Sequence, residues 1–547
     1  MAGETWTITH QSRNAMTKPT IRYTSILVAF VAAVAALGKP VQLDSGLVQG
    51  EPVQGTAVQV FRGIPYAAPP VGDLRWREPT AVEPWEGVRS ATEFGNICHQ
   101  GPALAAIIGE DLPTRSEDCL YLNVWSGAVG SETKQPVMVW IHGGGLTLGW
   151  GHQRGYDGTH LAEQGVVLVS INYRLGALGF LAHPLLNDEA GVSGNYGLKD
   201  QIAALEWVQL NIGAFGGDPN NVTIFGESAG GTSVHALIAS SRSRGLVHRG
   251  IAQSPWVTAS NYAHLHKDLP MVGSATGNGR QWIDTHFDGI DSLAKLRALG
   301  AEDVFAAQEA GYAVAVTVDG HFMPRHAVDV YKRGEQLDVP VIAGTNTDEG
   351  TIFQGMLPFN TPEDFSAAMQ EQFGDQAAMV LDLYPAEDAR SLFSAKAQLI
   401  TDTWFVQNTR NMLAGTAKVQ VLSNGWQYHF SRRAPQSPML GAFHGMEIRY
   451  VFGNLGPDAS AEDQALSAAM TRYWVQFAKT GDPNVEGLPA WPAYDPDSDQ
   501  HLELGDEIKA GVGYRKEAVD VLNLLWGATM TLTEPEDPAP KGPDVPE

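Results

Sequence analysis

The chain has 547 residues, of which 44% are hydrophobic and 18% are charged, so it is long and apolar enough to bury a large core. A formal net charge of −25 disfavours nucleic acid and anionic membrane surfaces as partners, because both are polyanionic. The sequence contains no HExxH, paired CxxC, Walker or GxGxxG motif, so we expect no metal and no other cofactor.

An apolar run near the N-terminus is typical of a signal peptide. Ile26–Leu37 follows the basic residues Lys18 and Arg22, ends in small residues and is short for a membrane span. We expect cleavage between Ala35 and Lys39, followed by export to the periplasm or the medium. No stable membrane anchor is expected after cleavage.

Residues 136–145 combine a strand with a glycine-rich loop. Pro136–Ile141 has the apolar composition of a buried strand, and His142–Gly145 follows it directly. Consecutive glycines let backbone N–H groups approach a substrate carbonyl, and lipases and esterases take part of their oxyanion hole from such a loop. We expect Gly144 and Gly145 to supply these donors; the alternative is a flexible glycine turn.

The next motif has the pattern of a nucleophile elbow. Val222–Phe225 reads as a strand, Gly226–Gly230 has the sequence Gly-Glu-Ser-Ala-Gly, and Gly231–Ala239 reads as a helix. This turn lifts a serine oxygen out of the backbone, so Ser228 is the predicted nucleophile and the N–H of Ala229 the remaining oxyanion donor. An ordinary glycine-rich turn is the alternative.

Acidic residues follow a later strand. Val339–Gly344 reads as a strand, and the turn after it contains the adjacent residues Asp348 and Glu349. In α/β-hydrolases the chain order is serine, acid, histidine, so this turn is in the right place for the acid. The local pattern leaves both carboxylates open.

Several longer segments match one family of enzymes. They are Phe61–Ala67, Glu117–Val124, Asn172–Gly176, Phe215–Gly217 continuing through Val222–Gly230, and Thr480–Asn484. With these segments the chain resembles the type-B carboxylesterases, the cholinesterase-like branch of the α/β-hydrolase fold, from about residue 45 to 500. The resemblance implies a mostly parallel central sheet flanked by helices, and a serine carboxylic-ester hydrolase.

The resemblance also selects the acid and the base. Cholinesterase-like enzymes use glutamate, which favours Glu349 and leaves Asp348 as the alternative. Among sixteen histidines the resemblance selects His444, in a loop region after the strand Trp426–Phe430. His429 is expected to be a sheet residue.

Other positions receive weaker expectations. His235 is expected to pack behind the elbow. Ser254 resembles the serine near the family's acid, and Glu447 the glutamate that follows its catalytic histidine. Both could equally be structural hydrogen bonders.

The family closes a surface loop with a disulfide at Cys98 and Cys119, the only two cysteines of the chain. Such a bond implies an oxidising compartment, whereas two buried free thiols are the alternative. The loop between them contains no Trp, Tyr or Phe, which argues against choline esters, because relatives that bind choline hold the ammonium on a tryptophan there. Trp150 and Trp256 are candidates for an acyl or alcohol pocket, or for the core.

The expected organisation is one catalytic unit between two terminal segments. Residues 1–38 form the signal-peptide region, in which Met16 is the better initiator, 39–533 the hydrolase domain, and 534–547 a disordered acidic tail. The stretch 353–425 has helical patterns and is expected to be an insertion at the wall or lid of the active-site gorge.

The expected substrate is a small molecule, a short- to medium-chain or aromatic ester. Two alternatives stay open from the sequence. The same triad can hydrolyse an amide, carbamate or thioester, and some relatives in this superfamily are non-catalytic binding proteins.

Overall fold

The computed structural model describes residues 38–258, 261–269, 272–419, 424–433 and 438–530. The predicted signal peptide, apart from Gly38, and the predicted acidic tail lie outside the described residues. No helix within the described ranges is long and apolar enough to cross a membrane.

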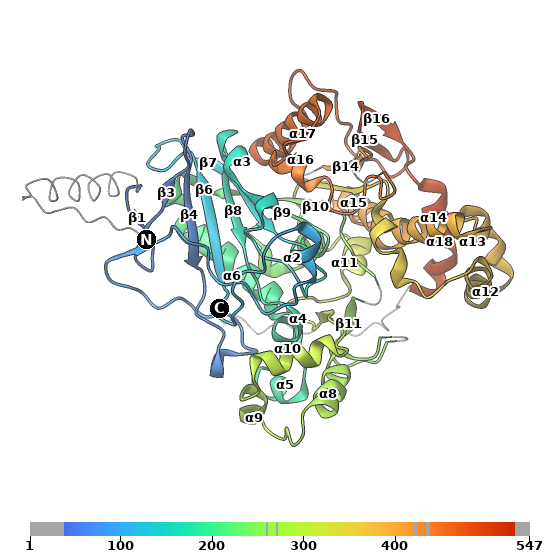
Figure 1. Cartoon of the computed structure of the whole chain (residues 1–547), viewed down its shortest axis with the longest axis horizontal. Coiled ribbons are helices and arrows are strands. Elements are labelled where there is room, and N and C mark those ends of the chain that lie inside the picture. Colours follow the sequence, from blue (N-terminus) through green and yellow to red (C-terminus); the bar gives the residue numbers. More distant parts are fainter. Residues whose placement is uncertain (1–37, 259–260, 270–271, 420–423, 434–437, 531–547) are drawn as a thin grey trace, which may run out of the picture.

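An eleven-stranded sheet forms the centre of the molecule (Figure 1). The strands from β15 to β8 run parallel to their neighbours, and antiparallel pairs complete both edges. This arrangement confirms the predicted fold. In sheet order the strands are β16 (Ile508–Val512), β15 (Gln500–Leu504), β14 (Gly425–Phe430), β13 (Val341–Asn346), β10 (Arg249–Gln253), β9 (Gly217–Glu227), β7 (Gln135–Ile141), β8 (Val167–Ile171), β6 (Tyr121–Ser126), β4 (Gln59–Pro65) and β3 (Glu51–Pro52).

Helices cover both faces of this sheet, which explains why the central strands β7, from Val137, and β8 are buried on both faces. In β7, for example, Val139 and Ile141 enter one core cluster while Met138 and Trp140 enter the other. The first cluster lies under α6 (Tyr196–Asn211), α7 (Ala229–Ala239), α11 (Ala327–Arg333) and α15 (Gln407–Val419). The second lies under α3 (Thr159–Glu163), α16 (Ile448–Phe452) and α17 (Ala461–Thr480).

Two further helical groups extend the molecule beyond the sheet. One packs below the sheet in Figure 1 and contains α4 (Gly176–Phe180), α5 (Pro184–Ala190), α8 (Ala275–His286), α9 (Leu293–Arg297) and α10 (Ala301–Glu309). The other, at the right, contains α12 (Pro362–Phe373), α13 (Ala377–Leu383), α14 (Ala389–Ile400) and the C-terminal helix α18 (Lys516–Met530). The stretch 353–425 is therefore largely helical, as predicted.

Short strands form two small additional sheets. These are β1 (Val41–Gln42), β2 (Leu47–Gln49) and β5 (Val88–Ser90), and the pair β11 (Tyr262–His264) and β12 (Val316–Val318).

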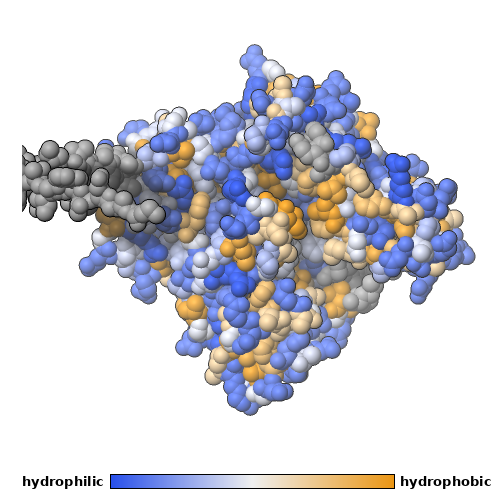
Figure 2. Space-filling model, in the orientation of Figure 1, coloured by the Kyte–Doolittle hydropathy of each residue, from blue (hydrophilic) through white to orange (hydrophobic). Residues whose placement is uncertain are grey.

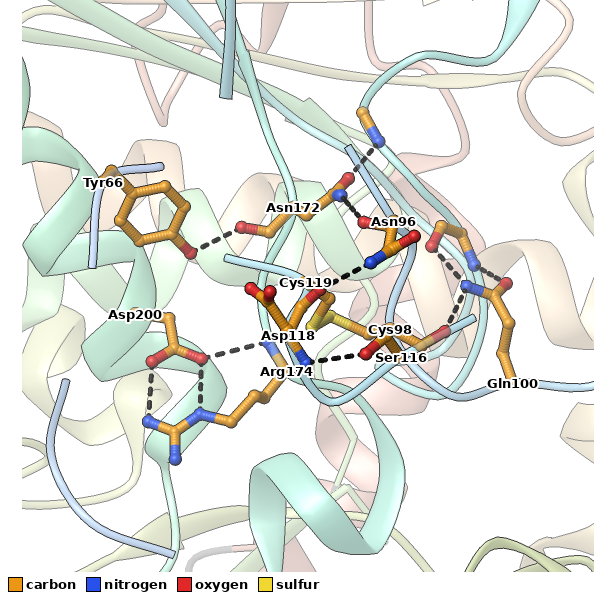
Figure 3. The surroundings of a disulfide bond; sticks show 12 residues. Tyr66, Asn96, Cys98, Gln100, Ser116, Asp118, Cys119, Asn172, Arg174 and Asp200 are labelled. Atoms are coloured by element: carbon orange, nitrogen blue, oxygen red, sulfur yellow. Dashed lines mark hydrogen bonds and ion pairs between the residues drawn. A yellow bond between two sulfur atoms is a disulfide. The ribbon is translucent and has the colours of Figure 1, made fainter. Parts of the chain in front are cut away.

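The predicted disulfide joins Cys98 to Cys119 (Figure 3). It closes a loop that contains the short helix α2 (Ala103–Ile108). Inside this loop the Gln100 amide donates to the carbonyl of Gly149 at 2.8 Å and accepts from its N–H at 2.7 Å. Gly149 belongs to the segment that continues from the glycine-rich loop after β7. The two hydrogen bonds therefore hold this segment against the disulfide loop.

Candidate active site

Ser228 lies at the sharp turn between β9 and α7. Its backbone has φ 57° and ψ −120°, a conformation that L-residues rarely adopt and that costs on the order of 1–3 kcal/mol. The turn packs tightly on β7: a Cβ atom on Gly226 or Gly230 would lie 2.5 or 2.0 Å from the carbonyl oxygen of Ile141. Glycine is therefore required at both positions, and the half-buried Ser228 side chain is held at the end of the sheet.

The glycine-rich loop lies against this turn. A Cβ atom on Gly143 would come within 3.1 Å of the Ser228 Cβ, so the loop and the elbow are direct neighbours. Gly144 and Gly145 have φ values of 111° and 63°, which favour glycine. Within the described part of the chain, the backbone N–H groups of Gly144, Gly145 and Ala229 donate to no backbone acceptor. These donors are free to bind an anionic oxygen.

Glu349 is fully buried and begins the short 3₁₀ turn η5 (Glu349–Ile352) after β13. Its Oε2 atom lies 2.5 Å from Nδ1 of His444. Its Oε1 atom accepts hydrogen bonds from the Ser254 hydroxyl at 2.5 Å and from the N–H of Asn346 at 2.6 Å. The carboxylate is thus fixed by three donors, and Ser254 contacts it as the resemblance implied.

Asp348, the alternative acid, faces a different partner. Its carboxylate accepts the N–H of Ala442 at 2.9 Å, and its own N–H donates to the Ala442 carbonyl at 3.0 Å. The Asn346 side chain adds a bond to the carbonyl of Phe443 at 2.9 Å. These contacts fasten the loop that carries His444 onto the turn that carries Glu349.

A second carboxylate faces the other ring nitrogen of His444. Oε1 of Glu227 lies 3.1 Å from Nε2, without the alignment of a hydrogen bond. Burial raises the pKa of Glu227 to about 8. Burial alone would lower the pKa of His444, but the carboxylates of Glu227 and Glu349 outweigh it and raise that pKa to about 9. Because Glu227 directly precedes Ser228, Nε2 of His444 faces the elbow.

Glu447, named from the resemblance, lies in the same buried cluster. It accepts hydrogen bonds from Gln253 at 3.0 Å and Asn346 at 2.6 Å, and burial raises its pKa. It makes no hydrogen bond to His444 among the described contacts, so it is part of the buried surroundings of Glu349 and His444.

The two histidines expected to be structural are structural. His429 lies in β14 with Nε2 2.8 Å from the Thr347 hydroxyl. His235 is buried in α7 and stacks on Tyr331 at 4.3 Å between ring centroids.

An aromatic wall, consisting of Trp256, Phe353, Trp404 and Phe405, stands beside His444. The rings of Phe405 and Phe353 lie 4.7 and 5.0 Å from the imidazole. The Trp404 ring lies 5.8 Å from the rings of both Phe353 and Trp256. Three of these residues come from the predicted insertion, although the sequence argument did not name them. Their only signal was the adjacent aromatic pair at Trp404 and Phe405 within a helical pattern.

The two tryptophans proposed for a pocket lie in different surroundings in the structure. Trp150 is 1% exposed and packs with Ile97 and Ala105 in a small core cluster. Trp256 is half-buried and faces Trp404. Only Trp256 joins the aromatic wall.

No group of His, Cys, Asp or Glu among the described residues is arranged to hold a metal ion.

Comparison with known proteins identifies the family. A model of the carboxylesterase family matches residues 38–522. The chain belongs to this family. It is 37% identical to a fumonisin B1 esterase of Sphingopyxis macrogoltabida over 90% of this chain and 92% of that protein. It is also 37% identical to a para-nitrobenzyl esterase of Bacillus subtilis (strain 168), over 85% of this chain and 94% of that protein.

A solved structure of a PNB esterase has the same fold. It superimposes with a TM-score of 0.76 at 34% identity and covers 88% of this chain and 99% of that chain. Because the chain belongs to this family and its relatives are esterases, the protein is a carboxylesterase, a hydrolase of carboxylic esters.

Proposed function

We propose that the carboxylesterase uses Ser228 as nucleophile, His444 as base and Glu349 as acid, with an oxyanion hole made by the N–H groups of Gly144, Gly145 and Ala229. The observation that carries this proposal is the 2.5 Å contact between Glu349 Oε2 and His444 Nδ1, with the opposite nitrogen facing the elbow. The contact fixes the tautomer in which Nε2 is free to accept a proton.

Hydrolysis then proceeds in two acyl-transfer steps. Ser228 Oγ attacks the ester carbonyl carbon while His444 Nε2 takes the hydroxyl proton, and Glu349 stabilises the imidazolium. The oxyanion accepts hydrogen bonds from the free backbone N–H groups. Each such bond stabilises the transition state by about 3–4 kcal/mol in comparable enzymes. The alcohol leaves with the proton from His444. Water repeats the sequence on the acyl-enzyme and releases the carboxylic acid.

The substrate class that the site favours is a neutral short- to medium-chain or aromatic ester. The aromatic wall offers apolar surface directly beside the base. Figure 2 shows hydrophobic surface near the middle of the face that α2 and the insertion helices border, and Ile107 of α2 is 79% exposed. Two relatives of this chain are named as a para-nitrobenzyl esterase and a fumonisin B1 esterase. The fold therefore accommodates more than one kind of ester.

We also propose export, to the periplasm or the medium. The Cys98–Cys119 disulfide supports an oxidising location, because such bonds rarely persist in the cytosol. The apolar run Ile26–Leu37 is the segment proposed to direct it.

The function is tested by hydrolysis of p-nitrophenyl acetate, butyrate, octanoate and palmitate by protein lacking residues 1–38. Ser228→Ala should lower kcat/KM at least about a thousandfold, because the nucleophile is lost. Ser241→Ala, at an exposed serine just beyond α7, should leave it unchanged. Equal activity of Ser228→Ala and the wild type would refute the triad, and a preference for palmitate would redefine the substrate as a lipid.

A further inference from the structure

The helical segment 389–419 is interrupted beside His444. Between α14 and α15, residues Thr401–Val406 form a π-helical turn, η8. Such turns are rare and short, so surrounding contacts must hold them in place. Trp404 and Phe405 of the aromatic wall both lie in this turn. The position of the wall therefore depends on whatever fixes η8.

Asp402 fixes the turn from within. Its side chain is fully buried, and its carboxylate accepts the Tyr384 hydroxyl at 2.6 Å. The guanidinium of Arg515 binds the same carboxylate through Nε, at 2.9 Å, and through Nη2. A buried carboxylate that loses its cation is strongly destabilised, so this two-pronged contact holds η8 to Arg515.

Arg515 belongs to the C-terminal junction, Gly513–Lys516, between β16 and the C-terminal helix. Its φ of 54° is unusual for a side-chain-bearing residue, so the backbone here is held in a defined conformation. The preceding residue, Tyr514, stacks on His429 at 3.6 Å, and His429 contacts Thr347, two residues before Glu349. One short segment thus reaches both η8 and the turn of the acid.

The π turn is also bonded directly to the acid's turn. The Thr401 hydroxyl oxygen accepts the N–H of Gly350 at 3.0 Å. A Cβ atom on Gly350 would lie 2.0 Å from the carbonyl of Ala397, so α14 touches the backbone next to Glu349. A displacement of η8 would therefore move the wall and disturb the acid together.

We propose that the Asp402–Arg515 pair is a positioning device that sets the acyl range of the enzyme by holding Trp404 and Phe405 against His444. Neither charged residue touches the reacting atoms; both act through η8. This inference rests on the proposed function, because it assumes that the ester reacts beside His444.

The test compares kcat and KM for p-nitrophenyl butyrate and octanoate in Arg515→Ala and Asp402→Asn. A loosened aromatic wall should raise KM for butyrate more than for octanoate. The octanoate-to-butyrate ratio of kcat/KM should therefore increase at least about fivefold. Arg515→Lys keeps the charge without the planar fork, and should restore the ratio in part.

A second trio of the same chemistry supplies the matched control. Asp463 accepts Arg432 Nε at 2.8 Å and the Tyr450 hydroxyl at 2.8 Å, and it ties the start of α17 to the segment after β14. Arg432→Ala should lower the thermal midpoint as Arg515→Ala does, but leave the substrate ratio unchanged.

An unchanged ratio in folded Arg515→Ala or Asp402→Asn would overturn the proposal and leave the pair a purely structural bond. Should both be too unstable to purify, Arg515→Lys decides alone: a lowered thermal midpoint with an unaltered ratio overturns it as well. Labelling with a fluorophosphonate distinguishes a failure of the proposed function from a failure of the positioning role. A wild type that is not labelled at Ser228 contradicts the proposed function, whereas labelled variants with the wild-type ratio contradict only the positioning role.

Discussion

The carboxyl group of Glu227 lies 3.1 Å from Nε2 of His444, the nitrogen that receives the serine proton in the proposed mechanism. Its negative charge, when present, favours the protonated imidazole, which cannot act as a base. Burial opposes that charge by raising the pKa of Glu227 to about 8. A protonated Glu227 at neutral pH removes one of the three carboxylate charges that raise the pKa of His444, and leaves Glu349 to orient the ring.

The pH dependence of activity tests this balance. Because only neutral His444 accepts the serine proton, kcat/KM should rise with pH toward the His444 pKa of about 9. Glu227→Gln removes a charge that raises this pKa, so the acid limb of the profile should move to lower pH. Glu447→Gln should move it less, since Glu447 has the smaller effect on His444. An acid limb that stays in place in Glu227→Gln would show that Glu227 does not control the base.

Single residues also show where sequence reasoning is sufficient and where it ends. Ser228 and its flanking glycines form a local motif, because strand, turn and helix follow one another within a few residues. The choice between Asp348 and Glu349 needed the family resemblance, since the partners Ala442 and His444 that distinguish the two carboxylates lie about 95 residues away. Hydrogen bonds of this range leave no local pattern.

At the scale of elements, α7 lies unusually close to β7. Gly230 has no room for a side chain, because its Cβ would lie 2.0 Å from a backbone carbonyl that cannot rotate away. The helix that follows Ser228 is therefore placed by contact with the strand that ends at the glycine-rich loop. The proposed nucleophile and the proposed oxyanion donors are therefore positioned by the same contact between α7 and β7.

Gly230→Ala should disrupt this contact. Pushing α7 away from β7 should cost about 1–3 kcal/mol of unfolding free energy and also misplace Ser228. Urea denaturation and kcat/KM for p-nitrophenyl butyrate measure the two effects. Gly213→Ala, where a Cβ would have nothing within 4 Å, is the control and should change neither. Normal stability and activity in Gly230→Ala would contradict the contact.

Elements of the insertion were predicted only in outline. The helical pattern of 353–425 was sufficient to expect helices at the gorge. The π turn was not predicted, because a single turn with altered hydrogen bonding within a helix has no compositional signature. The aromatic wall was missed for a related reason: Trp256 and Trp404 meet only once the sheet has brought their segments together.

At the scale of the whole molecule, the disulfide and the predicted signal peptide lead to one prediction. Protein recovered from the periplasm or medium of the producing cell should begin after residue 35 and carry no free thiol. Closing a loop of 21 residues stabilises a protein by roughly 3 kcal/mol in the chain-entropy model, so Cys98→Ser with Cys119→Ser should lower the thermal midpoint. N-terminal sequencing, thiol titration and thermal unfolding measure these outcomes; a retained apolar run would indicate an anchor instead.

The order of the sheet has a consequence for the newly made chain. Strand β13, with the acid, pairs with β10 on one side and β14 on the other, whereas the serine and the oxyanion loop follow β9 and β7. The first half of the polypeptide thus holds the proposed nucleophile without the proposed acid and base. On this proposal, a chain still being synthesised is inactive, because the triad is incomplete until Glu349 and His444 have been made.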